Sequence, residues 1–222
     1  LDRRPAMGLY PPPLPWLSKA EAQRQAVISI AASAAAARAD VASLDFADGE
    51  PWWLPPGRRD RPWLVAERAA AAPFAAAEDN VEAALAFLAQ RRTDMPGGTF
   101  VFVLSDFLAA PPLDAWVDAA GHGWDVVPVV VQDPVWERGW PDVAGVAVPV
   151  AQPGGERVRL VRVGRRDGER LRRERAERYA RTIAELESVG LRPVELGSAD
   201  PLDVDEAFLG WAEERRRGRW AR

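Results

Sequence analysis

The sequence predicts an α/β fold in which a mostly parallel sheet is covered by helices on both faces. The first observation is a pair of continuous apolar runs, FVFVL at residues 100–104 and VVPVVV at residues 126–131, which are typical of strands buried on both sides. The second is that helical patterns alternate with such strands along the whole chain, as in doubly wound folds. Because no internal repeat or linker interrupts the 222 residues, we expect a single domain over residues 1–222.

The first predicted helix follows a proline-rich loop. Four prolines stand between residues 8 and 17, and they exclude regular structure there. Ser18 and Glu21 form the capping-box pattern S-K-A-E, which predicts that a helix begins at Ser18. Apolar residues then recur with helical spacing, so we expect this helix to end near Arg38.

The next elements are a hairpin and two helices. Residues 41–46 resemble a strand, and Asp48-Gly49 is a turn signal that predicts a short return strand over residues 51–54. The alanine-rich residues 64–72 are compatible with a short helix. A firmer helix begins at Asp79, where the pattern D-x-x-E predicts a capping box.

The second half of the chain continues the alternation. Pro111 and Pro112 predict the start of a helix, since proline is favoured at the first helical position. Gly154-Gly155 separates two strand-like segments and predicts a hairpin. The remaining predicted elements are the hairpin strands 143–150 and 158–163, an amphipathic helix over 168–189, a strand over 191–196 and a last helix over 203–217.

Composition excludes several kinds of site. The chain has no cysteine and one histidine, so disulfides, thiol nucleophiles and metal sites with several histidines are excluded. The net charge of −4 argues against nucleic acid as the main partner. No apolar run approaches the roughly 18–20 residues of a membrane helix, and the start has no signal-peptide pattern. We therefore expect a cytoplasmic protein, although a longer membrane-associated parent protein is compatible with this sequence.

Three further features have an ordinary interpretation and a functional one. Lys19 is the only lysine among 29 basic residues, which we attribute to codon bias. Residues 156–181 contain eleven arginines and five acids; we favour a solvated helix face with Glu–Arg pairs over a surface for RNA or an acidic partner. Among ten tryptophans, Trp136 and Trp140 follow a strand end, where they either cover the sheet or form a binding surface.

Two aspartates stand where a ligand site is expected in such a fold. Asp106 directly follows the strand 100–104, and Asp2 has the equivalent place if Leu1 ends a strand. Ligands of open α/β sheets bind beyond the carboxyl ends of the strands. Two carboxylates there are suited to Mg²⁺, which prefers oxygen ligands. The alternative is that each aspartate only caps a turn or a helix.

Several segments together resemble a known bacterial family. They are DRRPAMGLYPPPLPWLSKAEA, LDFADGEPWW, TFVFVLSDFLAAPPL and VVPVVVQDPVWERGWPDVAGVAVPV, of which VFVLSDF and QDPVWE are the most specific. The chain resembles the domain of unknown function 58 family over nearly its whole length. The resemblance implies a fold like that of the von Willebrand factor A domain. It also implies a place for a metal-ion-dependent adhesion site.

This sequence departs from the metal-site pattern that the resemblance implies. The family pattern is aspartate-x-serine-x-serine followed by methionine, and Asp2 and Met7 match it. Arg4 and Ala6 stand where the two serines would be, so both hydroxyl ligands are lost. Asp106 matches the acid that follows the later strand. The resemblance therefore implies a degenerate metal site with Asp2 and Asp106 as its remaining ligands.

The arginine in this pattern suggests a replacement for the ion. A guanidinium is a permanent cation without a lone pair for a metal, so Arg4 beside the two aspartates would repel Mg²⁺ and pair with the carboxylates itself. The alternative is that Arg4 points to solvent and the site is inactive. A further loop that supplies threonine in related folds corresponds here to Asp79 and Asn80, and neither matches.

The resemblance also implies that the first strand is central. Its residues would precede Leu1 and lie between the strands 41–46 and 100–104. We therefore expect an N-terminally truncated fragment with a slot between those two strands, whose edges would have unpaired backbone groups.

The resemblance implies a protein-interaction module rather than an enzyme. Its members are often encoded beside MoxR-type AAA+ ATPases, so we expect an adaptor for such an ATPase in an envelope-associated or assembly process. The binding edge would consist of the loops after Leu1, Leu104 and Val131. Its candidate residues are Met7, Asp79, Asn80, Ser105, Asp133, Trp136 and Trp140. The alternatives are a metal-dependent hydrolase that uses Asp2 and Asp106, and a structural domain without a ligand.

Overall fold

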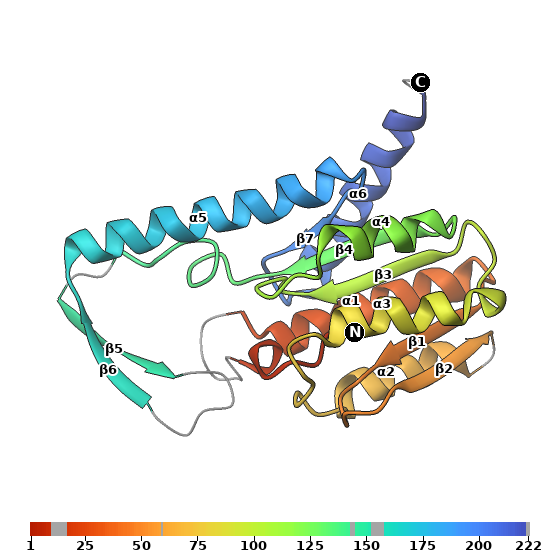
Figure 1. The fold of residues 1–222 in the computed structure, drawn as a ribbon, viewed down its shortest axis with the longest axis horizontal. Coiled ribbons are helices and arrows are strands. Elements are labelled where there is room, and N and C mark those ends of the chain that lie inside the picture. Colours follow the sequence, from red (N-terminus) through yellow and green to blue (C-terminus); the bar gives the residue numbers. More distant parts are fainter. Residues whose placement is uncertain (10–16, 59, 143–144, 152–157, 221–222) are drawn as a thin grey trace.

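The computed structural model describes residues 1–222 except 10–16, 59, 143–144, 152–157 and 221–222. Helices and strands alternate along the chain (Figure 1). In chain order the elements are η1 (Pro5–Gly8), α1 (Lys19–Ala36), β1 (Val41–Asp45), β2 (Trp52–Gly57), α2 (Arg61–Ala71), α3 (Asn80–Gln90), η2 (Arg92–Asp94), β3 (Phe100–Ser105), α4 (Leu113–Gly121), β4 (Asp125–Val131), β5 (Val146–Ala151), β6 (Val158–Val163), α5 (Arg165–Ser188), β7 (Val194–Leu196) and α6 (Pro201–Trp220).

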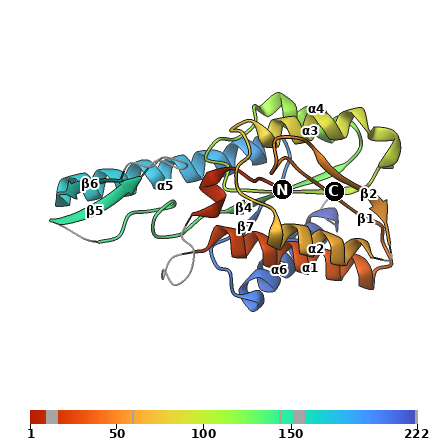
Figure 2. The same ribbon diagram turned by 90° about the horizontal axis from the view of Figure 1, so that it is seen from below.

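A parallel sheet lies between two layers of helices. Strands β3, β4 and β7 are hydrogen-bonded in that order, and both pairs are parallel. The turned view in Figure 2 shows α3 and α4 on one side of the sheet and α1, α2 and α6 on the other. The predicted α/β class, with a parallel sheet among helices, is confirmed.

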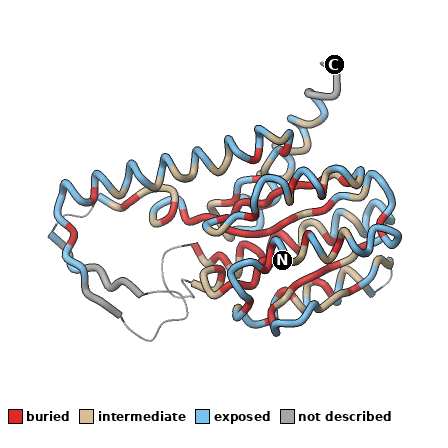
Figure 3. Tube along the Cα trace, in the orientation of Figure 1, coloured by how far each residue is buried: buried red, intermediate tan, exposed pale blue. Residues whose placement is uncertain are grey.

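The apolar runs of β3 and β4 are explained by burial on both faces. Val127, Val129 and Val131 pack into one core cluster with side chains of α1, α2 and α6. Val126 and Val130 point the other way, into a second cluster with α3, α4 and α5. Because successive side chains of a strand alternate between faces, a strand covered on both sides must be apolar at every position. β4 is buried after its first residue and β3 is buried at its carboxyl end, whereas Phe100 at the start of β3 is 50% exposed (Figure 3).

Two antiparallel pairs accompany the central sheet. β1 pairs with β2, with Asp45 opposite Trp52, and β5 pairs with β6, with Val146 opposite Val163. Both predicted hairpins are therefore present, although the Gly154-Gly155 turn lies outside the described residues. Figure 1 shows β5, β6 and the beginning of α5 projecting away from the sheet. We call β5, β6 and residues 165–171 of α5 the arm.

Some predicted boundaries are corrected. α5 begins at Arg165 rather than residue 168, because Gly164 is the extended N-cap and its carbonyl accepts the first helical hydrogen bond. β7 begins at Val194 rather than residue 191: the N–H of Leu191 closes the end of α5, and Pro193 has no N–H to donate. The predicted capping box at Asp79 is wrong, since its side chain makes no capping hydrogen bond.

The first two residues lie between β1 and β3. The Leu1 amino group donates to the Leu44 carbonyl at 2.8 Å, and the Asp2 N–H donates to the Leu104 carbonyl at 3.0 Å. In the sheets that the structure describes, β1 and β3 are not paired with each other. The N-terminal segment therefore links the ends of these two strands, whereas the expected upstream strand stays a prediction.

Two neighbouring residues of α4, one buried and one exposed, should contribute differently to the free energy of unfolding. Trp116 is almost fully buried and packs edge-on against Phe107, with 5.6 Å between ring centroids, whereas Val117 is 52% exposed. Trp116→Ala should lower the free energy of unfolding by about 3–5 kcal/mol, because it leaves a cavity. Val117→Ala should change it by less than about 0.5 kcal/mol. Urea unfolding measures both, and equal effects would contradict this packing.

Candidate functional site

The polar centre of the domain lies at the carboxyl end of β3. Ser105 is the last residue of β3, and Asp106 follows it directly. Asp2 reaches the same place because its N–H is bound to the carbonyl of Leu104. Both aspartates are buried. The structure thus brings together the two carboxylates that the sequence placed at neighbouring strand ends.

Arg4 lies between the two carboxylates. Its Nη2 is 2.6 Å from Asp2 Oδ2 and 2.6 Å from Asp106 Oδ1. Its Nε lies 3.1 and 3.0 Å from the two oxygens of Asp2, and its backbone N–H donates to Asp2 Oδ1 at 2.9 Å. The Arg4 side chain is only 3% exposed, so it does not point to solvent. Arg3 points elsewhere, since it donates to the carbonyl of Ala69.

Lys19 is a second cation in this centre. Its Nζ lies 2.8 Å from Asp106 Oδ2 and 2.7 Å from Glu137 Oε1, and the side chain is fully buried. Sequence analysis missed both Lys19 and Glu137. The available signal was that Lys19 is the only lysine in the chain, which we had attributed to codon bias. The structure places this lysine in the most buried charged position of α1.

We call Asp2, Arg4, Lys19, Asp106 and Glu137 the ion-pair centre. Neighbouring polar side chains complete its hydrogen bonds. Ser105 donates to Asp2 Oδ2 at 2.6 Å, and Asn80 Nδ2 donates to Asp2 Oδ1 at 3.0 Å. Gln23, one turn after Lys19 on α1, donates to the Asp2 carbonyl at 2.9 Å. Gln132 donates to the Asp106 carbonyl at 2.6 Å.

The electrostatics of the centre follow from burial and pairing. Burial alone raises the pKa of Asp2, but hydrogen bonds from Arg4 and Ser105 and the charge of Arg4 bring it below its ordinary value. Burial lowers the pKa of Lys19, and the charges of Asp106 and Glu137 more than compensate, so it is raised. The pKa of Glu137 is raised, because burial outweighs its contact with Lys19.

This arrangement does not fit a divalent metal ion. The oxygens of Asp2 accept from Arg4, Ser105 and Asn80, while those of Asp106 are paired with Arg4 and Lys19. Neither cation has a lone pair to offer a metal. Within the part of the chain that the structure describes, no group of three or more His, Asp or Glu side chains could hold a metal. A cationic nitrogen lies between the two aspartates, where a bridging ion would have to sit.

Several predicted edge residues are buried in this structure. They are Met7, Asn80, Ser105, Asp133 and Trp140. The side-chain oxygens of Asn80, Ser105 and Asp133 face inward, and each accepts at least one backbone N–H. Asp133, for example, accepts from the N–H groups of Leu17, Val135 and Trp136. In this structure they support the edge from inside, and their part in contacting a partner stays a prediction.

Other residues form the accessible part of this edge. Asp79 is exposed, as predicted, and Trp136 is partly buried against Trp140. Leu108, just after Asp106, is 37% exposed, and Val135 is 44% exposed. Glu78 is 85% exposed, and its Oε2 lies 3.7 Å from Arg4 Nη1. We call Glu78, Leu108 and Val135 the outer edge.

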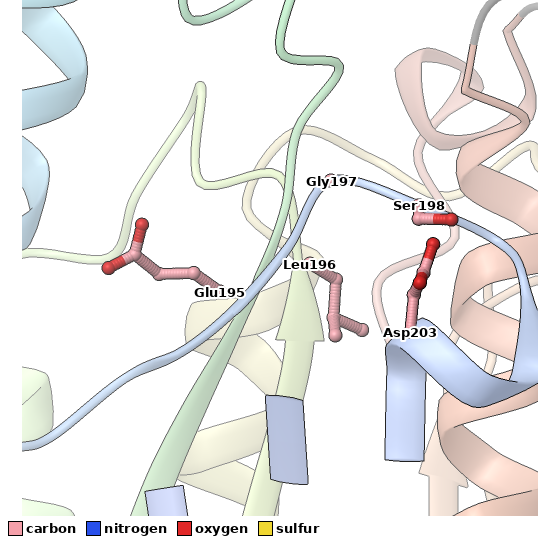
Figure 4. A pocket seen from close by; sticks show the side chains of 5 residues that line it. All are labelled: Glu195, Leu196, Gly197, Ser198 and Asp203. Carbon is pink, nitrogen blue, oxygen red and sulfur yellow. The ribbon is translucent and has the colours of Figure 1, made fainter. Parts of the chain in front are cut away.

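A separate pocket of about 220 Å³ lies at the carboxyl end of β7 (Figure 4). Glu195, Leu196, Gly197, Ser198 and Asp203 line it. In Figure 4 the Glu195 side chain points away from Ser198 and Asp203. None of the lining residues belongs to the ion-pair centre, so the pocket adds no ligand to it.

The fold and the site together define a class of protein. A parallel sheet between helical layers, with its polar centre at the carboxyl ends of the strands, is a Rossmann-like α/β domain. A family described as "Protein of unknown function DUF58" matches residues 16–185, which is most of the chain, and the chain therefore belongs to that family. No curated protein and no solved structure matches it. Across the described residues, every helix is too short or too polar to cross a membrane.

Removing the guanidinium of Arg4 should strongly destabilise the fold. Arg4→Met leaves Asp2 without its main cation and Asp106 with Lys19 alone, so the free energy of unfolding should fall by about 3–5 kcal/mol. Arg58→Ala is the matched control: its pair with Asp40 is exposed, and its loss should cost about 1 kcal/mol or less. Urea unfolding at pH 7 measures both variants.

The pH dependence separates an electrostatic effect from lost packing. In the wild type the pKa of Asp2 is lower in the folded state than in the unfolded state, where it is about 3.9. This difference stabilises the fold above about pH 3.9, and the stabilisation is lost as the pH falls through the folded pKa. In Arg4→Met, burial should raise that pKa, so stability should be lost as the pH rises. The difference between the two proteins should therefore grow from pH 4.5 to pH 7. A constant difference would indicate packing alone.

Proposed function

We propose that this chain is a cytoplasmic protein-interaction module that works as an adaptor, and not an enzyme. The observation that carries this proposal is that the carboxylates at the ligand-binding edge are already neutralised by cations of the same chain. A hydrolase that used Asp2 and Asp106 would need their oxygens free for a metal or a proton. Here those oxygens hold the edge together, and the outer edge offers apolar and acidic groups to a partner.

The site is further proposed to be a metal-free version of a metal-ion-dependent adhesion site on a fold like that of the von Willebrand factor A domain. Support comes from the placement of Asp2 and Asp106 around one cation and from Asn80, which approaches Asp2 from the first position of α3. Arg4 takes the place of the ion in this proposal. Its charge is permanent, so the edge would keep one shape at any metal concentration.

The partner that we propose is a MoxR-type AAA+ ATPase, which the family resemblance suggests. A carboxylate of the partner would approach Arg4 Nη1, the guanidinium nitrogen that faces Glu78. Charge-assisted pairs of arginine with carboxylate are among the stronger polar contacts at interfaces. Glu78 would then compete with the partner for Arg4, while Leu108 and Val135 would supply apolar contact.

Metal titration tests the role of Arg4. Mg²⁺ should not raise the melting temperature of the wild type, because Arg4 and Lys19 occupy the carboxylates. Arg4→Ser combined with Ala6→Ser removes the guanidinium and adds two hydroxyls, so a Mg²⁺-dependent rise should appear, since a ligand of the native state stabilises it. Adding Asp106→Ala to that double variant should abolish the rise. A rise in the wild type, or none in the double variant, would contradict the proposed geometry.

Binding measurements test the partner. Leu108→Asp and Val135→Asp should each weaken binding of a MoxR-type ATPase encoded beside this chain by about tenfold or more, as for central interface residues. Glu78→Gln should strengthen it by about two- to fivefold, the worth of one exposed ion pair. Val117→Asp, an exposed apolar position of α4, is the control and should have no effect. Lack of binding by the wild type would reject this partner.

A further inference from the structure

The loop after β4 has two faces that are held by different parts of the molecule. We call residues 133–142 the edge loop. Its inner face belongs to the ion-pair centre: Glu137 Oε1 pairs with Lys19 at 2.7 Å, and Glu137 Oε2 accepts from the Asp133 N–H at 2.9 Å. The Asp133 carboxylate accepts the N–H of Leu17, just before α1, at 2.7 Å. The inner face therefore ties the loop to the beginning of α1.

The outer face of the edge loop is held by arginines of α5. Arg172 Nε donates to the Trp140 carbonyl at 3.2 Å, and Arg178 Nη2 donates to the Glu137 carbonyl at 3.1 Å. Arg175, between them, donates to the Trp136 carbonyl, and its guanidinium lies 4.7 Å from the ring of Trp140. These arginines are spaced three residues apart, so they lie on one face of α5.

These three arginines differ from others on the same helix. Arg165 and Arg170, which belong to the arm, pair with Glu169 and Asp167 of α5 itself, as expected for a solvated helix face. The row at 172, 175 and 178 instead donates to main-chain carbonyls of another segment. A hydrogen bond to a carbonyl of the edge loop restrains the backbone of that loop. An ion pair between two side chains of α5 restrains only α5 itself. The arginine excess noted in the sequence is therefore partly used to hold the edge loop.

Glu137 is the residue that both faces share. Its carboxylate binds Lys19 inside, and its carbonyl binds Arg178 outside. Lys19 in turn binds Asp106, and Asp106 binds Arg4. A continuous chain of charged contacts thus runs from α5, which continues the projecting arm (Figure 1), to the centre at the end of β3.

We propose that Arg172, Arg175 and Arg178 are positioning residues that couple the arm to the ion-pair centre through the edge loop. A displacement of α5 would move the Glu137 carbonyl and with it the carboxylate that binds Lys19. Val135 of the outer edge belongs to the same loop, so its position would change too. A protein that engages the arm would thereby alter affinity at the outer edge. This last step rests on the proposed adaptor function, while the coupling itself does not.

Hydrogen exchange tests the coupling without any partner. Arg172→Ala combined with Arg178→Ala should raise amide exchange in the edge loop and in the first turn of α1 by about tenfold, as expected for two lost hydrogen bonds. β1, β2 and α3, which these arginines do not contact, should be unchanged. The control is Arg166→Ala with Arg173→Ala, two exposed positions of α5, which should change neither segment. Equal increases in both double variants, or a uniform increase over the domain, would overturn the proposal.

A double-mutant cycle gives an independent readout. Lys19 and Arg178 both contact Glu137, and distant uncoupled sites are additive. If they are coupled, the combined Lys19→Gln and Arg178→Ala variant should lose less of its urea midpoint than the two single losses together. Lys19→Gln with Arg173→Ala should be additive. Additivity in both pairs would overturn the coupling.

Partner binding separates this inference from the proposed function. The double variant at Arg172 and Arg178 should bind the MoxR-type ATPase about tenfold more weakly, although neither residue belongs to the outer edge. If exchange changes as expected and the wild type does not bind the ATPase, the coupling stands and the partner assignment fails. If the wild type binds and the variant binds equally well, the coupling to the outer edge is wrong.

Discussion

Buried charge at the end of β3 is the constraint on which the rest of this domain depends. Asp2 and Asp106 are held away from water, and an ionised carboxylate there is tolerated only with a cation and hydrogen bonds close by. Arg4 and Lys19 supply the charge, and Ser105 and Asn80 supply further donors. Because these groups come from four separate segments, compensation of the charge also fixes how those segments meet.

The edge of the sheet takes its shape from this compensation. α1 enters the centre through Lys19 and Gln23, and the edge loop enters through Glu137. The side chains expected at the surface are used instead as internal supports. Glu78, Leu108 and Val135 are exposed outside this buried base. In the proposed interaction module, side chains held by such a base would lose little conformational entropy when they meet a partner.

Arginines serve two purposes in this chain. Arg4 is a permanent charge in the centre, while the row on α5 holds backbone carbonyls of the edge loop. A planar guanidinium with five donors is better suited to both tasks than the ammonium group of lysine. The one lysine occupies a position where a compact point charge bridges two carboxylates. The proposed link between the arm and the edge follows from this distribution.

The sequence alone determined the α/β class, because the runs at residues 100–104 and 126–131 are apolar at every position and only a strand covered on both faces requires that. It also predicted Asp2 and Asp106 at one edge, since residues that follow parallel strands share that edge, but it left open whether Arg4 pairs with them or points to solvent. It could not find Glu137 or give Lys19 its role, because Lys19 contacts Asp106 and Glu137, which lie 87 and 118 positions away in the sequence with no repeating spacing. Only the tertiary structure decided which polar residues are buried and support the edge from inside, because burial depends on contacts between segments far apart in the sequence.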